Sequence, residues 1–87
     1  MDGFSLTLGE ILLFDAKLPP GLYIIWDNES PHPVFLEKTM MGCDERIVEQ
    51  WQGGPGANRD LNAAMHDAEP YCLEWAVDVY PSFNVPN

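Results

Sequence analysis

The spacing of hydrophobic positions changes several times along the chain, and each spacing predicts a different element. Within residues 7–17 the apolar side chains recur at helical intervals, and Thr7 and Glu10 stand three apart, the spacing of a capping box. Two prolines and a glycine follow, and they are expected to end this helix. Apolar and polar residues also alternate from Phe4 to Leu8, which leaves a strand as the competing interpretation. We favour a short lead-in followed by a helix.

Three segments are expected to form strands. Residues 21–26 are mostly β-branched or aromatic, and residues 34–40 follow after a turn-rich connection, so the two predict an antiparallel hairpin with a long loop. In residues 71–80 apolar side chains occupy every second position, which is typical of a half-buried strand. The apolar set of that strand is Tyr71, Leu73, Trp75, Val77 and Val79.

Two helices are expected between the second and third of these strands. Asp44 is expected to cap a helix within residues 42–52, and Asn58 to cap another that runs to about Ala68. Their apolar faces consist of Ile47, Val48 and Trp51 in the first helix and of Leu61, Ala64, Met65 and Ala68 in the second. The predicted fold is α+β in the order α-β-β-α-α-β, a three-stranded antiparallel sheet with two or three short helices packed on it.

Size and composition indicate one folded domain. The chain has 87 residues, of which 46% are hydrophobic and 11% aromatic, more than a disordered acidic tail would carry. We expect residues 1–87 to form a single compact domain in which 81–87 is an extended tail. A domain of this size buries about 60–65% of its unfolded surface, which leaves little room for a deep substrate pocket.

The charge of the chain is one-sided. Fourteen acidic residues against four basic ones give a formal net charge of −10. Phosphate contacts need Lys and Arg, so this balance disfavours direct binding to nucleic acid or to an anionic membrane. It favours a basic protein surface as the partner, attracted over a distance that salt screening sets. Solubility alone is the alternative explanation of the charge.

Candidate chemistry is sparse. The run Gly53–Gly56 precedes a helix start, where backbone amides bind phosphate, but it lacks the Lys and the Ser or Thr of a Walker loop, so a linker is favoured. His66, Asp67 and Glu69 form a polar cluster, but a metal site needs three or four convergent ligands, so a solvated helix end is favoured. Neither cysteine stands in the local signature of a Cys–His nucleophile. We therefore expect no enzyme activity, no cofactor and no metal.

Cysteine usage indicates a compartment. The chain has only two cysteines, and its first residues include no basic stretch followed by a long apolar run. A secreted mini-protein usually carries four or more cysteines at framework spacings. We therefore expect a cytoplasmic protein with free thiols and without a signal peptide or a membrane-spanning helix.

Two short runs near the N-terminus resemble known sequences. TLGEIL at residues 7–12, followed by LPPGLYI at residues 18–24, is similar to the opening of many small phage and prophage proteins, in which a short helix ends at Leu-Pro-Pro and leads into a strand. The size and acidity of the chain also resemble those of the inhibitors that phages make against bacterial defence systems, including DNA-mimic and anti-CRISPR proteins. This likeness of class implies an inhibitor that acts in the host cytoplasm.

Close DNA mimicry needs a denser charge than this chain carries. A duplex about 30 Å long carries about 18 phosphate charges, and the acids here are spread along the sequence. Folding can still gather them into two patches. The less dense of the two consists of Asp67, Glu69, Glu74 and Asp78. The first and denser patch, with two tryptophans as expected aromatic anchors, gives the candidate partner-binding residues Asp27, Glu29, Asp44, Glu45, Glu49, Trp26 and Trp51.

The main hypothesis is a small acidic protein-binding inhibitor, phage-encoded, that acts as a monomer or homodimer. It would dock on a basic, nucleic-acid-binding surface of a host defence or nucleic-acid-processing protein, with carboxylates steering the approach. A non-inhibitory structural or assembly subunit, homo-oligomeric through a sheet edge, is the second hypothesis. A small metal-binding protein or enzyme is the third.

Overall fold

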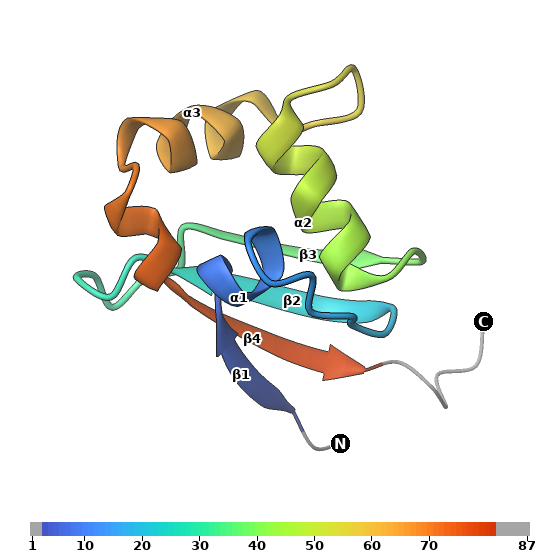
Figure 1. Ribbon diagram of the computed structural model, residues 1–87. Helices are drawn as coiled ribbons and strands as arrows, with labels where there is room; N and C mark the ends of the chain where they lie inside the picture. The colour runs from blue at the N-terminus through green and yellow to red at the C-terminus, as the bar shows by residue number, and fades with distance from the viewer. Residues whose placement is uncertain (1–2, 82–87) are drawn as a thin grey trace.

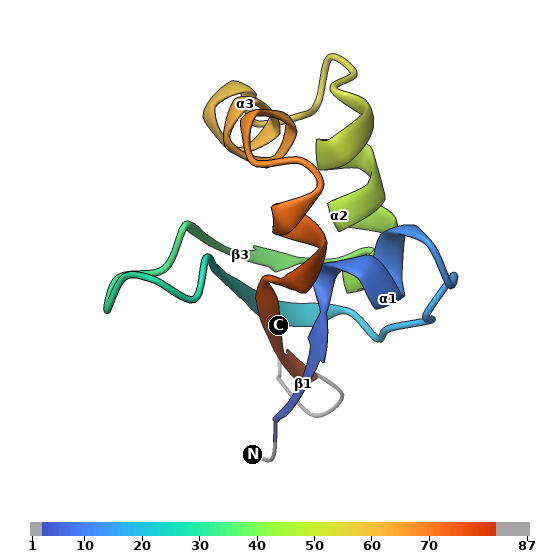
Figure 2. The same ribbon diagram turned by 60° about the vertical axis from the view of Figure 1, so that its left-hand side comes forward.

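The computed structural model describes residues 3–81. They form a four-stranded antiparallel sheet in the order β1-β4-β2-β3, and the helices lie on one of its faces (Figures 1 and 2). The elements are β1 (Phe4–Thr7), α1 (Leu8–Leu12), β2 (Gly21–Trp26), β3 (Phe35–Thr39), α2 (Cys43–Gln52), α3 (Arg59–Asp67), the 3-10 helix η1 (Tyr71–Glu74) and β4 (Ala76–Pro81). The predicted α+β class, with an antiparallel sheet and short helices, is confirmed.

The sheet has one strand more than the three predicted. β1 pairs with β4, with Phe4 opposite Val79 and Thr7 opposite Ala76, so the favoured lead-in is wrong and the competing strand is right. Four alternating residues are a weak signal, and their partner strand lies at the other end of the chain. The capping box is confirmed, because Thr7 and Glu10 exchange the two expected hydrogen bonds at the start of α1.

The first helix is shorter than predicted. α1 ends at Leu12 rather than near residue 17, because Leu13 and Phe14 find no cover in the core and Asp15 takes a positive φ of 53°. The chain then crosses to the start of α2, where the Leu18 amide donates to the Asp44 carboxylate over 3.0 Å.

The two central helices match their prediction in extent. Asn58 caps α3 as expected, with its side-chain oxygen accepting from the Leu61 amide over 3.0 Å. Gly53 ends α2 with a left-handed φ of 76°. The cap predicted at Asp44 is wrong: the N-cap is Gly42, and the Asp44 side chain bonds the loop before β2 instead.

The last predicted strand is two elements. Residues 71–74 form η1, and only Ala76–Pro81 forms β4, which lies between β1 and β2. Cys72, which the alternation directed to solvent, is fully buried, whereas Tyr71, which it directed inward, is 76% exposed. Residues 82–87 of the predicted tail lie outside the described residues, and Pro81 is the last residue of β4.

The core lies between the sheet and the helices. Its sheet side is made by alternate residues of the central strands, and the other side of those strands faces away from the helices (Figure 2). The buried hydrophobic residues are Leu8, Ile11, Tyr23, Ile25, Cys43, Ile47, Leu61, Met65, Cys72, Trp75, Val77 and Val79. Within residues 3–81, none of the helices combines the length and apolarity that a membrane crossing needs.

A candidate acidic cleft beside the β2–β3 loop

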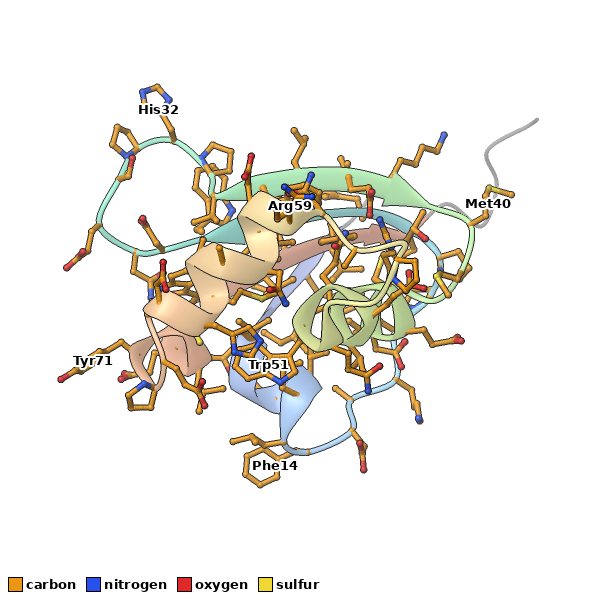
Figure 3. All side chains as sticks on the ribbon, turned by 90° about the horizontal axis from the view of Figure 1, so that it is seen from above. Phe14, His32, Met40, Trp51, Arg59 and Tyr71 are labelled. Atoms are coloured by element: carbon orange, nitrogen blue, oxygen red, sulfur yellow. The ribbon has the colours of Figure 1, made fainter. Side chains whose placement is uncertain are left out.

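Three segments line a cleft of about 500 Å³ at one end of the sheet. The β2–β3 loop, η1 and the end of the α3 segment contribute its walls. We call the following residues the acidic cleft: Asp27, Asn28, Glu29, Ala68, Tyr71, Glu74 and Trp75. Figure 3 shows Tyr71 on the same side of the molecule as His32 of the β2–β3 loop, with its side chain extending away from the ribbon.

Hydrogen bonds hold the β2–β3 loop in place. One carboxylate oxygen of Asp27 accepts from the amides of Glu29 and Ser30, at 3.0 and 3.2 Å, so the loop closes on its own side chain. Asn28 takes a left-handed φ of 70°, which Asn tolerates better than most residues. Its side-chain amide donates to the backbone carbonyl of Glu74 over 2.8 Å and so ties the loop to η1.

The cleft combines negative charge with aromatic surface. Asp27, Glu29 and Glu74 carry its carboxylates, and within residues 3–81 none of the three forms an ion pair. Tyr71 is exposed beside them, and the largely buried Trp75 forms part of the wall. Carboxylates pair with guanidinium and ammonium groups, and aromatic rings attract the same cations through their faces. The arrangement therefore suits a Lys or Arg side chain.

The first acidic patch expected from the sequence is not assembled. The β2–β3 loop and the first turn of α2 lie at opposite ends of the sheet, since β3 runs between them (Figure 1). Asp27 and Glu29 meet Glu74 instead of the α2 acids. Asp44 is only 8% exposed and bonded to a backbone amide, so it is not available to a partner.

The remaining α2 acids differ in their surroundings. Glu45 is exposed, whereas Glu49 pairs with Arg46. Arg46 also donates from Nε to Glu37 over 2.8 Å, and the Tyr23 hydroxyl donates to the same carboxylate over 2.9 Å. The hydrogen bond from Arg46 lowers the pKa of Glu37, and burial raises the pKa of Tyr23. This network joins α2 to the sheet and has a structural role.

Neither of the expected tryptophan anchors stands free. Trp26 is partly buried and donates from its indole nitrogen to the Asp78 carboxylate over 3.0 Å. Trp51 stacks on His66 of α3, with 3.9 Å between ring centroids, and lies between α2 and α3 in Figure 3. Tyr71 is the exposed aromatic of the cleft, although the period-two pattern of residues 71–80 predicts that it is buried in the core.

The other candidate chemistry is not assembled in the described part of the chain. Both cysteines are buried, and burial raises the pKa of Cys43 to about 11 and also raises that of Cys72, so the reactive thiolate is disfavoured in each. No group of three His, Cys, Asp or Glu side chains within residues 3–81 converges as metal ligands would.

Comparison of the chain with protein-family models, with curated proteins and with solved structures found no match. Function is therefore inferred from the side chains of this chain alone.

Proposed function

We propose that this chain is a small acidic protein-binding inhibitor of the phage type. It docks on a basic, nucleic-acid-binding surface of a larger host defence or nucleic-acid-processing protein. The observation that supports this most is the acidic cleft, where three carboxylates that form no ion pair within residues 3–81 lie beside the exposed ring of Tyr71. A surface rich in Lys and Arg, of the kind that binds nucleic acid, supplies the complementary chemistry.

Docking divides into steering and anchoring. The net charge of −10 attracts a basic partner from a distance and raises the association rate. At contact, an Arg or Lys side chain of the partner enters the cleft, pairs with Asp27, Glu29 or Glu74, and lies against the Tyr71 ring. The tether from Asn28 to Glu74 holds two walls of the cleft together before the partner arrives, which reduces the ordering cost of binding.

The experiment begins with capture of partners from a host lysate at low salt, with identification by mass spectrometry. Affinity for the captured protein is then measured at low and at high ionic strength. We expect affinity to fall steeply as salt rises, because surface charges are screened. An affinity that does not change with salt would contradict the electrostatic part of the proposal.

Matched variants separate the cleft from the general charge. Glu74→Gln and Glu45→Gln remove the same charge, but only Glu74 lines the cleft, since Glu45 is exposed at the far end of the sheet. Tyr71→Ala removes the aromatic anchor, and we expect it to weaken binding about tenfold. Equal losses for Glu74→Gln and Glu45→Gln would show that the cleft is not the docking site.

A further inference from the structure

The face of the sheet opposite the helices is a second surface, and no helix or strand within residues 3–81 covers it (Figures 1 and 2). Its centre consists of side chains in two cross-strand rows, which the strand register defines. Tyr80, Leu22 and Lys38 form the first row, and Asp78, Ile24 and Leu36 form the second. Trp26 lies at the end of β2 on the same face and reaches Asp78.

This face is apolar and electrically balanced, unlike the rest of the molecule. Among the strand residues that point to it, the only charged ones are Lys38 and Asp78, which have opposite signs. Leu36 is 56% exposed there, and Leu22 and Ile24 are partly exposed. On a chain of charge −10, a net-neutral apolar face lets two copies meet closely without placing their acids against one another.

The two charges stand diagonally about the centre of the face. Lys38 is opposite Leu22 on one side of β2, and Asp78 is opposite Ile24 on the other side. Strand spacing and residue rise place their Cα atoms about 12 Å apart. The midpoint between them falls between Leu22 and Ile24. If a second sheet is stacked on this face, a two-fold axis that lies between the two sheets and passes over this midpoint places Lys38 of one copy over Asp78 of the other.

We propose that a second copy of this chain covers the open face and forms a two-fold symmetric dimer. Lys38 of each copy then faces Asp78 of the other, across a shared centre of Leu22 and Ile24. The two sheets cross at roughly 70°, nearer to the orthogonal class of sheet packing than to the aligned one.

Two hydrogen bonds within the chain already orient the Asp78 carboxylate. Ser5 donates a hydrogen bond to one of its oxygens and the Trp26 indole donates to the other, over 3.0 Å in the second case. An ionised carboxylate accepts about four hydrogen bonds, so capacity remains for an ammonium group. Because the side chain is already oriented, less conformational entropy is lost when the lysine pairs with it.

The size of the face sets the strength of the dimer. The four strands have four to six residues, so the sheet spans roughly 19 by 17 Å, or about 330 Å² for each copy. This is less than half of the ~800 Å² that each partner of a standard stable interface contributes. An interface of this size belongs to the weak, transient class, so we expect dimers to form only at high concentration, up to about 1 mM. Long-range repulsion between the acidic copies is screened by salt, so added salt strengthens this dimer.

Sedimentation equilibrium over a range of concentrations tests the proposal. We expect the mass of the wild type to rise from 9.8 kDa toward twice that value as concentration increases. Leu36→Lys, in the face, should weaken association at least tenfold. Leu13→Lys is the matched control, since Leu13 is similarly exposed at 60%, lies outside the face and gives the same charge change. A wild type that stays monomeric up to about 1 mM, or equal effects of the two variants, would overturn the proposal.

Charge exchange tests the geometry of the pairs. Lys38→Glu should weaken the dimer more than Lys17→Glu, which makes the same change in the loop before β2. The double variant Lys38→Glu with Asp78→Lys restores both pairs with reversed sign, and we expect it to recover association. If the double variant is stably folded but associates no more strongly than Lys38→Glu, the paired arrangement is overturned. If Asp78→Lys prevents folding, the comparison of Leu36→Lys with Leu13→Lys decides whether this face forms the dimer.

Different variants test the dimer and the proposed inhibitor function, so either proposal can be disproved without the other. Tyr71→Ala lies in the acidic cleft and should leave the sedimentation mass unchanged. Leu36→Lys should leave the salt-sensitive binding of the basic partner in place. The two associations also respond to salt in opposite directions, because one joins unlike charges and the other joins like-charged copies.

Discussion

Asn28 and Glu74, which lie 46 positions apart in the chain, are joined by a hydrogen bond of 2.8 Å from the asparagine side chain to the glutamate carbonyl. The bond connects the β2–β3 loop to η1 at the acidic cleft. Its acceptor is a backbone atom, so the Glu74 carboxylate remains available. Asn28 also occupies a left-handed backbone conformation, which makes it both the turn residue and the tether.

Replacing the tether should loosen the cleft without unfolding the domain. Asn28→Gly keeps the freedom to take a positive φ but removes the donor, so we expect a loss of about 0.5–1.5 kcal/mol in unfolding free energy. Hydrogen exchange should show faster opening at the Glu29 and Ser30 amides, with the strand amides of β2 little changed. Unchanged exchange in the loop would show that the bond does not hold it.

The sequence predicts a helix boundary correctly where the boundary depends on side chains only a few residues away. The capping box at Thr7, the cap at Asn58 and the break at Gly53 lie where the sequence predicts them, because each is made within a few residues. Asp44 has the same capping chemistry, but its oxygen bonds Leu18, which is 26 positions away. A contact of that kind has no local signal.

The sequence predicts no cleft, and only the loop acids of the cleft belong to the predicted partner-binding set. Asp27 and Glu29 were expected to bind a partner, and they line the cleft, but Glu74 and Tyr71 join them only because η1 replaces the first half of a predicted strand. Backbone bonds from the end of α3 continue into that turn, as in the bond from the Cys72 amide to the Ala68 carbonyl. Trp75, Val77 and Val79, the later members of the alternating set, are buried as that pattern predicts. The alternation therefore does not reveal that residues 71–74 leave the strand.

The contact between Gly9 and Leu73 should make Gly9→Ala destabilising despite its better helix propensity. A Cβ at Gly9 would lie 2.9 Å from the Leu73 carbonyl oxygen, at the point where α1 meets η1. The gain of up to about 1 kcal/mol in propensity is outweighed by overpacking of about 1–3 kcal/mol. Gly54→Ala is the control, since a Cβ there meets nothing within 4 Å, and its effect should stay within about 0.5 kcal/mol in urea unfolding. A Gly9→Ala variant as stable as the wild type would contradict this packing.

The network of Glu37 with Arg46 and Tyr23 should contribute to stability at neutral pH and lose that contribution in acid. The pKa of Glu37 is lowered from its ordinary value of 4.5 when the chain folds, chiefly by the hydrogen bond from Arg46. As the pH falls, the unfolded chain therefore binds a proton before the folded chain does. The stabilisation is present above pH 4.5 and is lost as the pH falls through the lowered pKa of the folded chain. Compared with Glu37→Gln, the wild type should be more stable by about 1–2 kcal/mol at pH 7, with the difference shrinking below pH 4.5. Urea unfolding at several pH values measures this, and a difference that grows in acid would contradict the assignment.

The thiols of Cys43 and Cys72 should react only when the protein opens. Both are fully buried, and burial raises the pKa of Cys43 to about 11 from an ordinary value of 9.0. At pH 8 we expect a thiol reagent to modify the native chain at least about 100-fold more slowly than the chain in denaturant, since opening is rare. Because the folded pKa is raised, the neutral thiol stabilises the fold below pH 9 and this contribution falls as the pH rises above it. We compare the unfolding free energy of each protein with its value at pH 8. Between pH 8 and pH 11 this free energy should fall less for Cys43→Ala than for the wild type. Rapid labelling of both thiols in the native chain would contradict their burial.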